Sequence, residues 1–417
     1  MSNKKNEKIV EKKKNILVID DSALMRRVTS DIINKDPRFI VSDFATNGFE
    51  ALDIIYKNYG KYDAVVCDIN MPKMTGIEVL KELKRHKIRV RVIMSSTMTL
   101  PGAKETIHAL ELGAFDFVTK PSSYVKAVNS DFGSNLMKAL YVACDIEEEW
   151  DKLVQEQTED EKSIADDTVF VKEISKSEPG KSEHEVKKVH VPKPERKKHV
   201  ADIKSLVIKA EDNKEIKPDF GMEKLVVIAS STGGPKALSK VISKLDGQLD
   251  APVVVVQHMP AGFTDSLAAR LDEISEVKVK EAEDGDELCK GVVYIARGGR
   301  HLKVERKNGK GILRVYDGPA VVGLKPCADI TIESLNEVGY GSILFVVMTG
   351  MGQDGTKGLL SLKKTIKKKV VAQDQKTSAV FGMPKAVINA KLADEVLALD
   401  KISKEINQTT GVRKHGC

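Results

Sequence analysis

Short apolar runs alternate with longer segments in two separate parts of the chain, and this alternation restricts the fold more than any other feature of the sequence. The runs have the length of buried strands, and the segments between them carry apolar residues at helical spacing. This pattern is typical of parallel sheets covered by helices. We therefore predict an α/β protein with two doubly wound domains, of which the first contains five βα units.

The apolar runs place the first domain at residues 15–145 and the second at residues 223–405. The strands predicted in the first domain are Ile16–Ile19, Ile40–Phe44, Ala64–Cys67, Val90–Met94 and Phe115–Val118. Those predicted in the second are Leu225–Ala229, Val253–Gln257, Val292–Ile295, Ile343–Met348 and Val370–Ala372. In doubly wound sheets the chemistry gathers at the carboxyl ends of the strands, so polar residues at those ends are the candidates for function.

The residues between the two domains, 146–222, have a different composition. From residue 151 to residue 222, 15 of the 72 residues are Lys or Arg, 17 are Asp or Glu, and two are aromatic. Such a segment cannot bury a core of its own, so we predict a charged, flexible linker. We also expect a basic tail at residues 1–14 and a second tail at residues 406–417.

The sequence argues against several classes of protein. The longest apolar stretches, such as Ile343–Met348, are too short to cross a bilayer, and the basic start of the chain lacks the apolar core of a secretory signal. The five cysteines are scattered and show no paired metal-ligand spacing. We therefore expect a cytoplasmic protein that does not span the membrane and whose thiols are free.

Nucleic-acid binding is also disfavoured. The net charge of +6 is small, because 67 basic residues are nearly balanced by 61 acidic ones. The lysine run Lys363–Lys369 has no aromatic residues among its charges, so we interpret it as the solvated face of a helix that follows Gly358.

Five polar residues stand at strand ends in the first domain. Asp20 and Asp21 follow the first strand, Asp68 the third, Ser95 the fourth and Lys120 the fifth. Three carboxylates at one edge repel one another unless a divalent cation lies between them, and an oxygen-only ligand set suits Mg²⁺. A carboxylate in that position can accept a phosphoryl group, whose charge the cation and the ammonium of Lys120 would neutralise.

Each of these residues alone has a simpler explanation, since Asp21 could cap a helix and Lys120 could be surface charge. Together, the motifs DD, D-x-N-M-P-x-M-x-G, Ser and Lys-Pro are unlikely to occur by chance. Residues 15 to about 140 resemble the receiver domain of bacterial response regulators, which has a flavodoxin-like (βα)5 fold. The resemblance implies that Asp68 is the phosphoacceptor. It also implies Mg²⁺ ligands at Asp20, Asp21, Asp68 and the backbone carbonyl of Asn70, phosphoryl contacts at Ser95 and Lys120, and a switching aromatic at Phe117.

A second set of polar residues lies at strand ends in the second domain. Ser231 follows the strand Leu225–Ala229 in the turn S-S-T-G-G-P, His258 follows the next strand, and Asp354 follows Ile343–Met348 through a short Gly-rich loop. A histidine can remove the proton of a serine hydroxyl, and a carboxylate fixes that histidine. The turn does not satisfy the G-x-S-x-G nucleophile motif, so by itself it could equally bind a phosphate.

Ser230 competes with Ser231 for the role of nucleophile. Alternation along a strand points two adjacent side chains in opposite directions, so only one of them can face the site. We predict that Ser231 is the nucleophile.

The second domain resembles the catalytic domain of the chemotaxis protein-glutamate methylesterases over residues 223 to about 400. The matching motifs are I-x-x-S-T-G-G, Q-H-M-P, T-G-M-G-x-D-G, A-Q-D and F-G-M-P-K. A receiver followed by a Rossmann-like esterase domain is the architecture of that family. By this resemblance Ser231 is the nucleophile, His258 the general base and then acid, and Asp354 its orienting partner. Backbone N–H groups near Thr232 and Met351 would form the oxyanion hole.

The resemblance also implies a function. The enzyme would hydrolyse glutamate 5-O-methyl esters on methyl-accepting chemotaxis receptors and deamidate receptor glutamines, with no cofactor at the esterase site. A chemotaxis histidine kinase would be the phosphodonor, Mg²⁺ would assist phosphorylation, and the protein would act at the cytoplasmic face near receptor arrays. Phosphorylation of Asp68 would open the cleft at Ser231.

The sequence departs from the family pattern at a few positions. Ala229-Ser230 replaces a common Gly-Ala, Arg297 replaces a Pro, and Lys325 and Cys327 interrupt a usual R-P-S pattern. These departures affect expectations about the surface that meets the substrate. Two other functions remain open from the sequence: a response regulator whose second half only binds a partner, and a serine hydrolase of small esters or amides.

Overall fold

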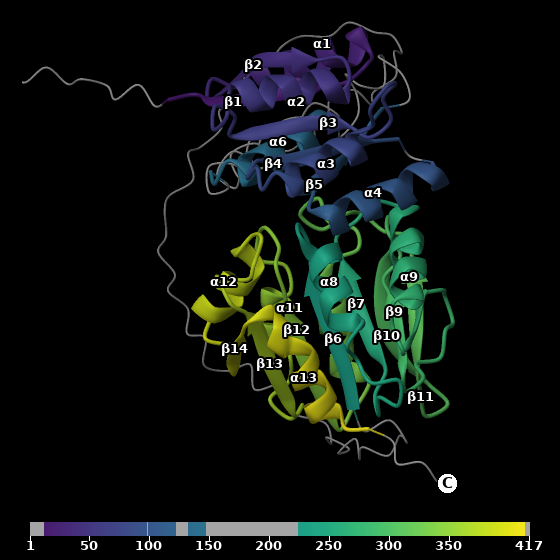
Figure 1. Ribbon diagram of the computed structural model, residues 1–417. Coiled ribbons are helices and arrows are strands. Elements are labelled where there is room, and N and C mark those ends of the chain that lie inside the picture. Colours follow the sequence, from purple (N-terminus) through teal and green to yellow (C-terminus); the bar gives the residue numbers. More distant parts are fainter. Residues whose placement is uncertain (1–11, 98, 122–131, 147–223, 413–417) are drawn as a thin grey trace, which may run out of the picture. The chain divides into compact units, whose positions relative to one another are not determined.

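The computed structural model describes residues 12–97, 99–121, 132–146 and 224–412 (Figure 1). The two predicted α/β domains lie in one compact unit of the chain. The linker predicted at residues 146–222 falls outside the described residues except for its first residue, as do most of the predicted basic tail and the last residues of the chain. Within the described residues, no helix has both the length and the apolar character needed to span a membrane.

The first domain is a five-stranded parallel sheet in the order β2-β1-β3-β4-β5 (Figure 1). Its strands are β1 (Lys14–Ile19), β2 (Phe39–Ala45), β3 (Ala64–Asp68), β4 (Arg91–Ser96) and β5 (Asp116–Thr119). Its helices are α1 (Ala23–Asn34), α2 (Gly48–Lys57), α3 (Gly76–Arg85), α4 (Leu100–Leu112) and α6 (Phe132–Ala143). This is the predicted arrangement, and every strand predicted for this domain is present.

Helix starts in the first domain follow from local side-chain chemistry. Ser22, Asn47 and Thr99 each cap a helix by accepting a hydrogen bond from a backbone N–H of the first turn. Thr75 and Glu78 form a complete capping box at the start of α3. These caps start each helix just after the strand ends, which keeps the polar loop residues at one edge of the sheet.

The second domain contains a seven-stranded parallel sheet in the order β14-β13-β12-β6-β7-β9-β8 (Figure 1). Its strands are β6 (Lys224–Ser230), β7 (Val253–Gln257), β8 (Lys278–Glu281), β9 (Val292–Ile295), β12 (Ser342–Val347), β13 (Lys368–Gln373) and β14 (Glu395–Leu397). Its helices are α8 (Gly234–Ile242), α9 (Phe263–Glu273), α10 (Ala328–Ser334), α11 (Thr356–Ser361), α12 (Gly382–Asn389) and α13 (Leu399–Thr410), with a short 3-10 turn at Leu335–Glu337.

The side chains of β6 alternate between two hydrophobic cores. Val226 and Ile228 belong to the core that contains residues of α8, α9 and α13. Leu225, Val227 and Ala229 belong to the core that contains residues of α10, α11 and α12. Both faces of the sheet are therefore covered, which explains why the strands appear in the sequence as continuous apolar runs.

The structure adds four strands that the sequence did not predict. Strands β8 and β14 form the two edges of the large sheet, and β10 (His301–Lys307) pairs with β11 (Lys310–Tyr316) as an antiparallel hairpin. These strands are short or partly exposed and carry many charged residues, so they lack the apolar runs of the central strands.

The interpretation of the lysine run as a helix face was wrong. Helix α11 ends at Ser361, and the run forms a turn that leads into β13. Lys363 pairs with Glu337, while Lys369 pairs with Glu395 and Glu405. The physical reason is that β13 already begins at Lys368 and includes the last two lysines of the run, so too few residues remain between Ser361 and the strand to continue the helix.

The end of the second domain extends past the expected boundary at residue 405. Helix α13 continues to Thr410, and Val412 forms an isolated bridge with Leu249. The first residues assigned to the tail therefore complete the domain.

Strand order reverses at one point in each sheet, between β1 and β3 in the first and between β6 and β12 in the second. A crevice forms at such a switch point, outside the carboxyl ends of the strands, and ligands bind there. Asp20, Asp21 and Asp68 follow or end the two strands at the first switch point. Ser231 and Asp354 follow the two strands at the second.

Candidate functional site

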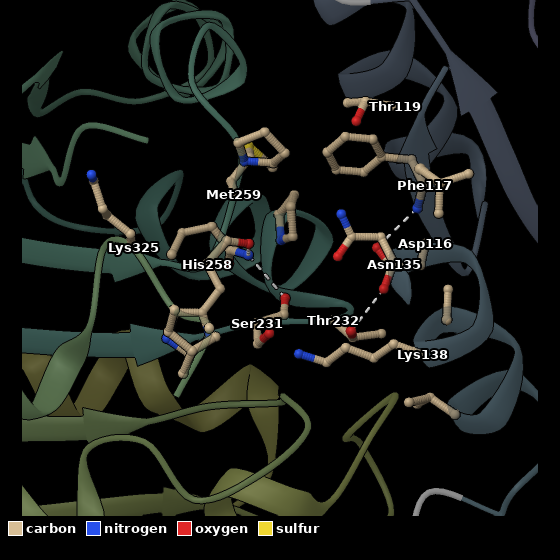
Figure 2. Close-up of a pocket in the computed structure, with 18 residues that line it drawn as sticks. Asp116, Phe117, Thr119, Asn135, Lys138, Ser231, Thr232, His258, Met259 and Lys325 are labelled. Carbon is tan, nitrogen blue, oxygen red and sulfur yellow. Dashed lines mark hydrogen bonds between the residues drawn. The ribbon is translucent and has the colours of Figure 1, made fainter. Parts of the chain in front are cut away.

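The end of β6 separates the two adjacent serines. Ser230 is fully buried, and its hydroxyl donates to Oε1 of Gln257 at 2.7 Å. Ser231 is the next residue and lines a cavity of about 240 Å³ (Figure 2). The hydroxyl of Ser230 is thus committed to the interior of the domain, whereas the side chain of Ser231 faces the space where a substrate can enter.

Gln257 holds the backbone of this site together. Its side-chain nitrogen donates to the carbonyl of Ser231 at 3.0 Å and to the carbonyl of His258 at 3.0 Å. The backbone N–H of His258 also donates to the carbonyl of Ser230 at 3.0 Å. Because Gln257 is buried, these bonds fix the ends of β6 and β7 relative to each other.

Two positions at the site require glycine, because neighbouring side chains approach the backbone too closely to leave room for a Cβ atom. A Cβ atom on Gly350 would lie 2.8 Å from Cβ of Ser231 and 2.4 Å from Sδ of Met383. A Cβ atom on Gly234 would lie 1.9 Å from Oε1 of Gln257. A larger residue at either position would displace the predicted nucleophile or the amide that supports it.

His258 and Asp354 form a buried pair. Nε2 of His258 lies 2.7 Å from Oδ2 of Asp354. Burial alone would favour the neutral acid, but the hydrogen bond and charge of His258, together with backbone N–H donors, lower the pKa of Asp354 to about 2. Asp354 is therefore a carboxylate at neutral pH, as a partner for a catalytic histidine must be.

The second nitrogen of His258 is available for chemistry. Nδ1 is buried and has no hydrogen-bond partner within the residues that the structure describes. His258 lines the same cavity as Ser231 (Figure 2). The structure thus places His258 in contact with Asp354 and, on the same cavity, beside Ser231.

The predicted oxyanion hole lies beside Ser231. The backbone N–H of Ser231 donates to the carbonyl of Thr349, and the backbone N–H of Gly350 donates to the carbonyl of Val380, so neither is free. Among the hydrogen bonds of the described residues, neither Thr232 nor Met351 donates its backbone N–H. Both groups therefore remain candidates for binding a developing oxyanion.

Residues of the first domain line part of this cavity. They come from β5 and α6 and include Asp116, Phe117 and Lys138 (Figure 2). The hydroxyl of Thr232 donates to Oδ2 of Asp116 at 2.7 Å, and burial raises the pKa of that carboxyl. The ring of Phe117 packs against Phe263 with centroids 4.8 Å apart.

The acidic pocket of the first domain contains a tight ionic cluster. Nζ of Lys120 lies 2.7 Å from Oδ2 of Asp20 and 2.8 Å from Oδ2 of Asp68. Burial, only partly offset by Lys120, raises the pKa of Asp68. Burial disfavours the charge on Lys120, but the carboxylates of Asp68 and Asp20 raise its pKa nonetheless.

Asp21 completes the group. One carboxylate oxygen from each of Asp20, Asp21 and Asp68 can be chosen so that all three lie within 4.8 Å of one another, and Asp21 is exposed while the other two are buried. An all-oxygen group of this size, open to solvent on one side, fits the needs of a hard divalent cation such as Mg²⁺.

The other residues predicted at the acidic pocket are placed as follows. Ser95 is buried and lies opposite Asp68 in the β3–β4 register. The side chain of Asn70 donates to Glu105, and its backbone N–H donates to Oδ1 of Asp68 at 3.4 Å. Among the described residues, no hydrogen-bond donor reaches the carbonyl of Asn70, so this oxygen is free for a ligand role.

Several residues of the site were not identified from the sequence. Gln257 stood inside a motif that drew attention only to its histidine. Asp116 belongs to the other domain, and Thr232 was predicted only for its backbone N–H, not for the side-chain bond to Asp116. Cys327 and Asp329 donate hydrogen bonds to Asp354. Cys327 was noted only as a departure from a family pattern, so that departure was the available signal.

Comparisons with known proteins show which families the chain matches. The family model for CheB methylesterase matches residues 226–406, and the model for the response regulator receiver domain matches residues 16–129. The chain is 36% identical over 391 residues to a protein-glutamate methylesterase/protein-glutamine glutaminase of Pyrococcus abyssi, covering 94% of this chain and 92% of that one. It is 37% identical to the protein of the same name from Thermotoga maritima, covering 94% of this chain and 97% of that one. The solved catalytic domain of Thermotoga maritima CheB methylesterase is 46% identical, with a TM-score of 0.43, covering 45% of this chain and 98% of that domain.

Proposed function

Because the chain belongs to the CheB methylesterase family and carries a response regulator receiver domain in front of the catalytic domain, we propose that Ser231, His258 and Asp354 are the catalytic triad of a protein-glutamate methylesterase. The substrates are glutamate 5-O-methyl esters on chemoreceptors, and the products are glutamate and methanol. The observation that carries the proposal is the buried His258–Asp354 pair beside Ser231: His258 and Ser231 line the same cavity, and Nδ1 of His258 has no hydrogen-bond partner among the described residues.

The chemistry follows from the positions of these atoms. The hydroxyl oxygen of Ser231 attacks the ester carbonyl while Nδ1 of His258 takes the hydroxyl proton, since Nε2 is bonded to Asp354. The oxyanion is bound by the backbone N–H groups of Thr232 and Met351. The C–O bond to methanol breaks as His258 returns the proton to the leaving oxygen.

Water completes the cycle. It attacks the acyl-enzyme, His258 accepts its proton, and Ser231 leaves with that proton restored. Deamidation of receptor glutamine uses the same steps, with ammonia in place of methanol as the leaving group. Neither reaction needs a redox partner or a second substrate other than water.

The receiver domain makes the esterase responsive to phosphorylation, and we assign the phosphoacceptor role to Asp68. Asp20, Asp21 and Asp68 would hold Mg²⁺, which when bound neutralises charge on the phosphoryl group being transferred. Lys120 contacts Asp68 directly and would pair with the phosphoryl oxygens. A chemotaxis histidine kinase in the cytoplasm would supply the phosphoryl group.

Strand β5 connects the phosphorylation pocket with the esterase cavity. Lys120 directly follows β5 and bonds to Asp68, while Asp116 and Phe117 on the same strand contact Thr232 and Phe263. A phosphoryl group on Asp68 competes for Lys120 and adds negative charge there. The proposed result is a shift of β5 that weakens its contacts beside Ser231 and opens the cavity.

The test is methanol release by the whole protein from methylated receptor, compared with release of alcohol from generic small esters. A methylesterase cleaves the receptor far faster than the small esters, and a small phosphodonor with Mg²⁺ increases the rate. Equal rates on both substrates would favour a general esterase. A lack of any hydrolysis would favour a regulator that only binds a partner.

A further inference from the structure

The carboxylate of Asp354 accepts more hydrogen bonds than its pairing with His258 requires. Besides His258, it accepts three backbone N–H groups and one thiol. The backbone donors are Ala328 at 2.6 Å, Asp329 at 2.9 Å and Gly355 at 3.0 Å. The thiol donor is Cys327, whose Sγ lies 3.2 Å from Oδ1. In the described residues, Cys327 and His258 are thus the only side chains that bond to Asp354.

The direction of the Cys327 bond is fixed by the charges of the two groups. Asp354 is ionised and can only accept, because its pKa is lowered to about 2. Burial and the neighbouring Asp354 charge raise the pKa of Cys327 to about 12, so its sulfur keeps the proton and donates it. Cys327 is 1% exposed, and no competing water can reach the bond from bulk solvent.

One of these backbone donors, Gly355, is also held by a second carboxylate. Oδ1 of Asp329 accepts the N–H of Gly355 at 2.9 Å and of Gly358 at 2.6 Å. Asp354 in turn accepts the N–H of Asp329. These reciprocal bonds fix the start of α10 against the loop that carries Asp354. The backbone N–H groups thus set where the carboxylate lies, and the thiol of Cys327 adds a side-chain donor on Oδ1, the oxygen that does not face His258.

We propose that Cys327 is a positioning residue of the esterase, whose thiol holds Oδ1 of Asp354 so that Oδ2 stays aimed at Nε2 of His258. The inference rests on the proposed function of the triad. It also gives a role to a position where this chain departs from the usual serine of the family pattern. A thiol is a weaker donor than a hydroxyl, so the carboxylate here remains a somewhat stronger acceptor for the histidine.

The experiment compares Cys327→Ala and Cys327→Ser with the wild-type whole protein in methanol release from methylated receptor, measured from pH 5 to pH 9. In the alanine variant we expect kcat to fall about tenfold with KM nearly unchanged, because one hydrogen bond to a charged group is lost. The groups that face Asp354 are His258 from the end of β7 and Cys327 and Asp329 from the start of α10.

The pH profile distinguishes positioning from simple packing. With one donor fewer, the Asp354 carboxylate stabilises protonated His258 more strongly, so the acidic limb of kcat/KM should move to higher pH in Cys327→Ala. Cys327→Ser restores a donor and should return both kcat and the acidic limb to wild-type values or move the limb to lower pH. Loss of packing alone would lower thermal stability without moving the limb.

Controls make each outcome decisive. Cys144→Ala removes another buried cysteine, in the receiver domain, and should leave kcat and the pH profile unchanged. Wild-type kcat in a folded Cys327→Ala protein would overturn the inference. If Cys327→Ala does not fold, the test rests on Cys327→Ser. A folded Cys327→Ser protein whose kcat falls about tenfold would then overturn the inference. Ser231→Ala is measured in parallel, because activity that survives that change would overturn the proposed triad, not the role of Cys327.

Discussion

The contact between Asp116 and Thr232 gives a quantitative test of how the receiver domain restrains the esterase. The change is Asp116→Ala, which removes the acceptor of the 2.7 Å hydrogen bond from Thr232 and leaves the catalytic side chains untouched. Asp116 is the residue of β5 that bonds directly to the neighbour of Ser231. If β5 covers the cavity before phosphorylation, loss of this bond should release it in part.

The size of the effect follows from the bond. A hydrogen bond to a charged group contributes about 1.5–3 kcal/mol. Asp116 is partly buried, and the cost of burying its charge, seen in its raised pKa, reduces the net value toward about 1 kcal/mol. Since 1.4 kcal/mol is about a factor of ten, the basal esterase activity should rise about fivefold. The ring contact between Phe117 and Phe263 remains and limits the release.

The assay is methanol release from methylated receptor by unphosphorylated whole protein. Asp116→Ala should raise this basal rate while the rate with a phosphodonor and Mg²⁺ stays near the wild-type maximum. Asp53→Ala is the matched control, because Asp53 is exposed on α2 and, within the described part of the chain, pairs only with Lys57 of the same helix. An unchanged or lower basal rate in folded Asp116→Ala protein would refute the restraint by this contact.

Three further results are expected. Asp68→Asn should keep the basal rate of methanol release but abolish the increase caused by a small phosphodonor with Mg²⁺. Chelation of Mg²⁺ should abolish the same increase in the wild type. An Asp68→Asn protein that still responds to the phosphodonor would show that Asp68 is not the phosphoacceptor. Gly350→Ala should lower kcat at least a hundredfold, because its Cβ would lie 2.8 Å from Cβ of Ser231; near-normal turnover would show that the turn adapts. Asp354→Asn should lower the free energy of unfolding by about 2 kcal/mol, judged from a carboxyl pKa lowered from 3.8 to about 2. In urea unfolding that deficit should stay constant from pH 7 to about 4 and shrink as the pH falls toward 2, whereas a deficit that fades already near pH 6 would contradict the lowered pKa.

The sequence predicted the central strands of both sheets because their residues are buried on both faces. Such strands contain continuous apolar runs, as in Val253–Val256, and the turns after them contain glycine or acidic residues. The edge strands β8 and β14 were missed because one side of each has no partner strand, so charged residues such as Lys278 and Glu395 are tolerated there. Strands β10 and β11 were missed because a hairpin with one exposed face carries charges at alternate positions.

The sequence was enough to predict which residues gather at the candidate site, but not how their side chains contact one another. The rule that strand ends share an edge was enough to group Ser231, His258 and Asp354. It could not show that Gln257 engages Ser230, that Nε2 rather than Nδ1 of His258 faces the carboxylate, or that Cys327 bonds to it. These facts depend on side-chain rotation and on contacts between residues far apart in the chain, which periodicity and spacing do not encode.

The assignment of the nucleophile is tested most directly by comparing two adjacent serine variants. Methanol release from methylated receptor is measured for Ser231→Ala and Ser230→Ala in the whole protein, with thermal unfolding to confirm that both are folded. We expect Ser231→Ala to have no measurable turnover. Ser230→Ala should keep substantial activity, because its hydroxyl only supports Gln257. Near-normal methanol release by Ser231→Ala would show that Ser231 is not the nucleophile.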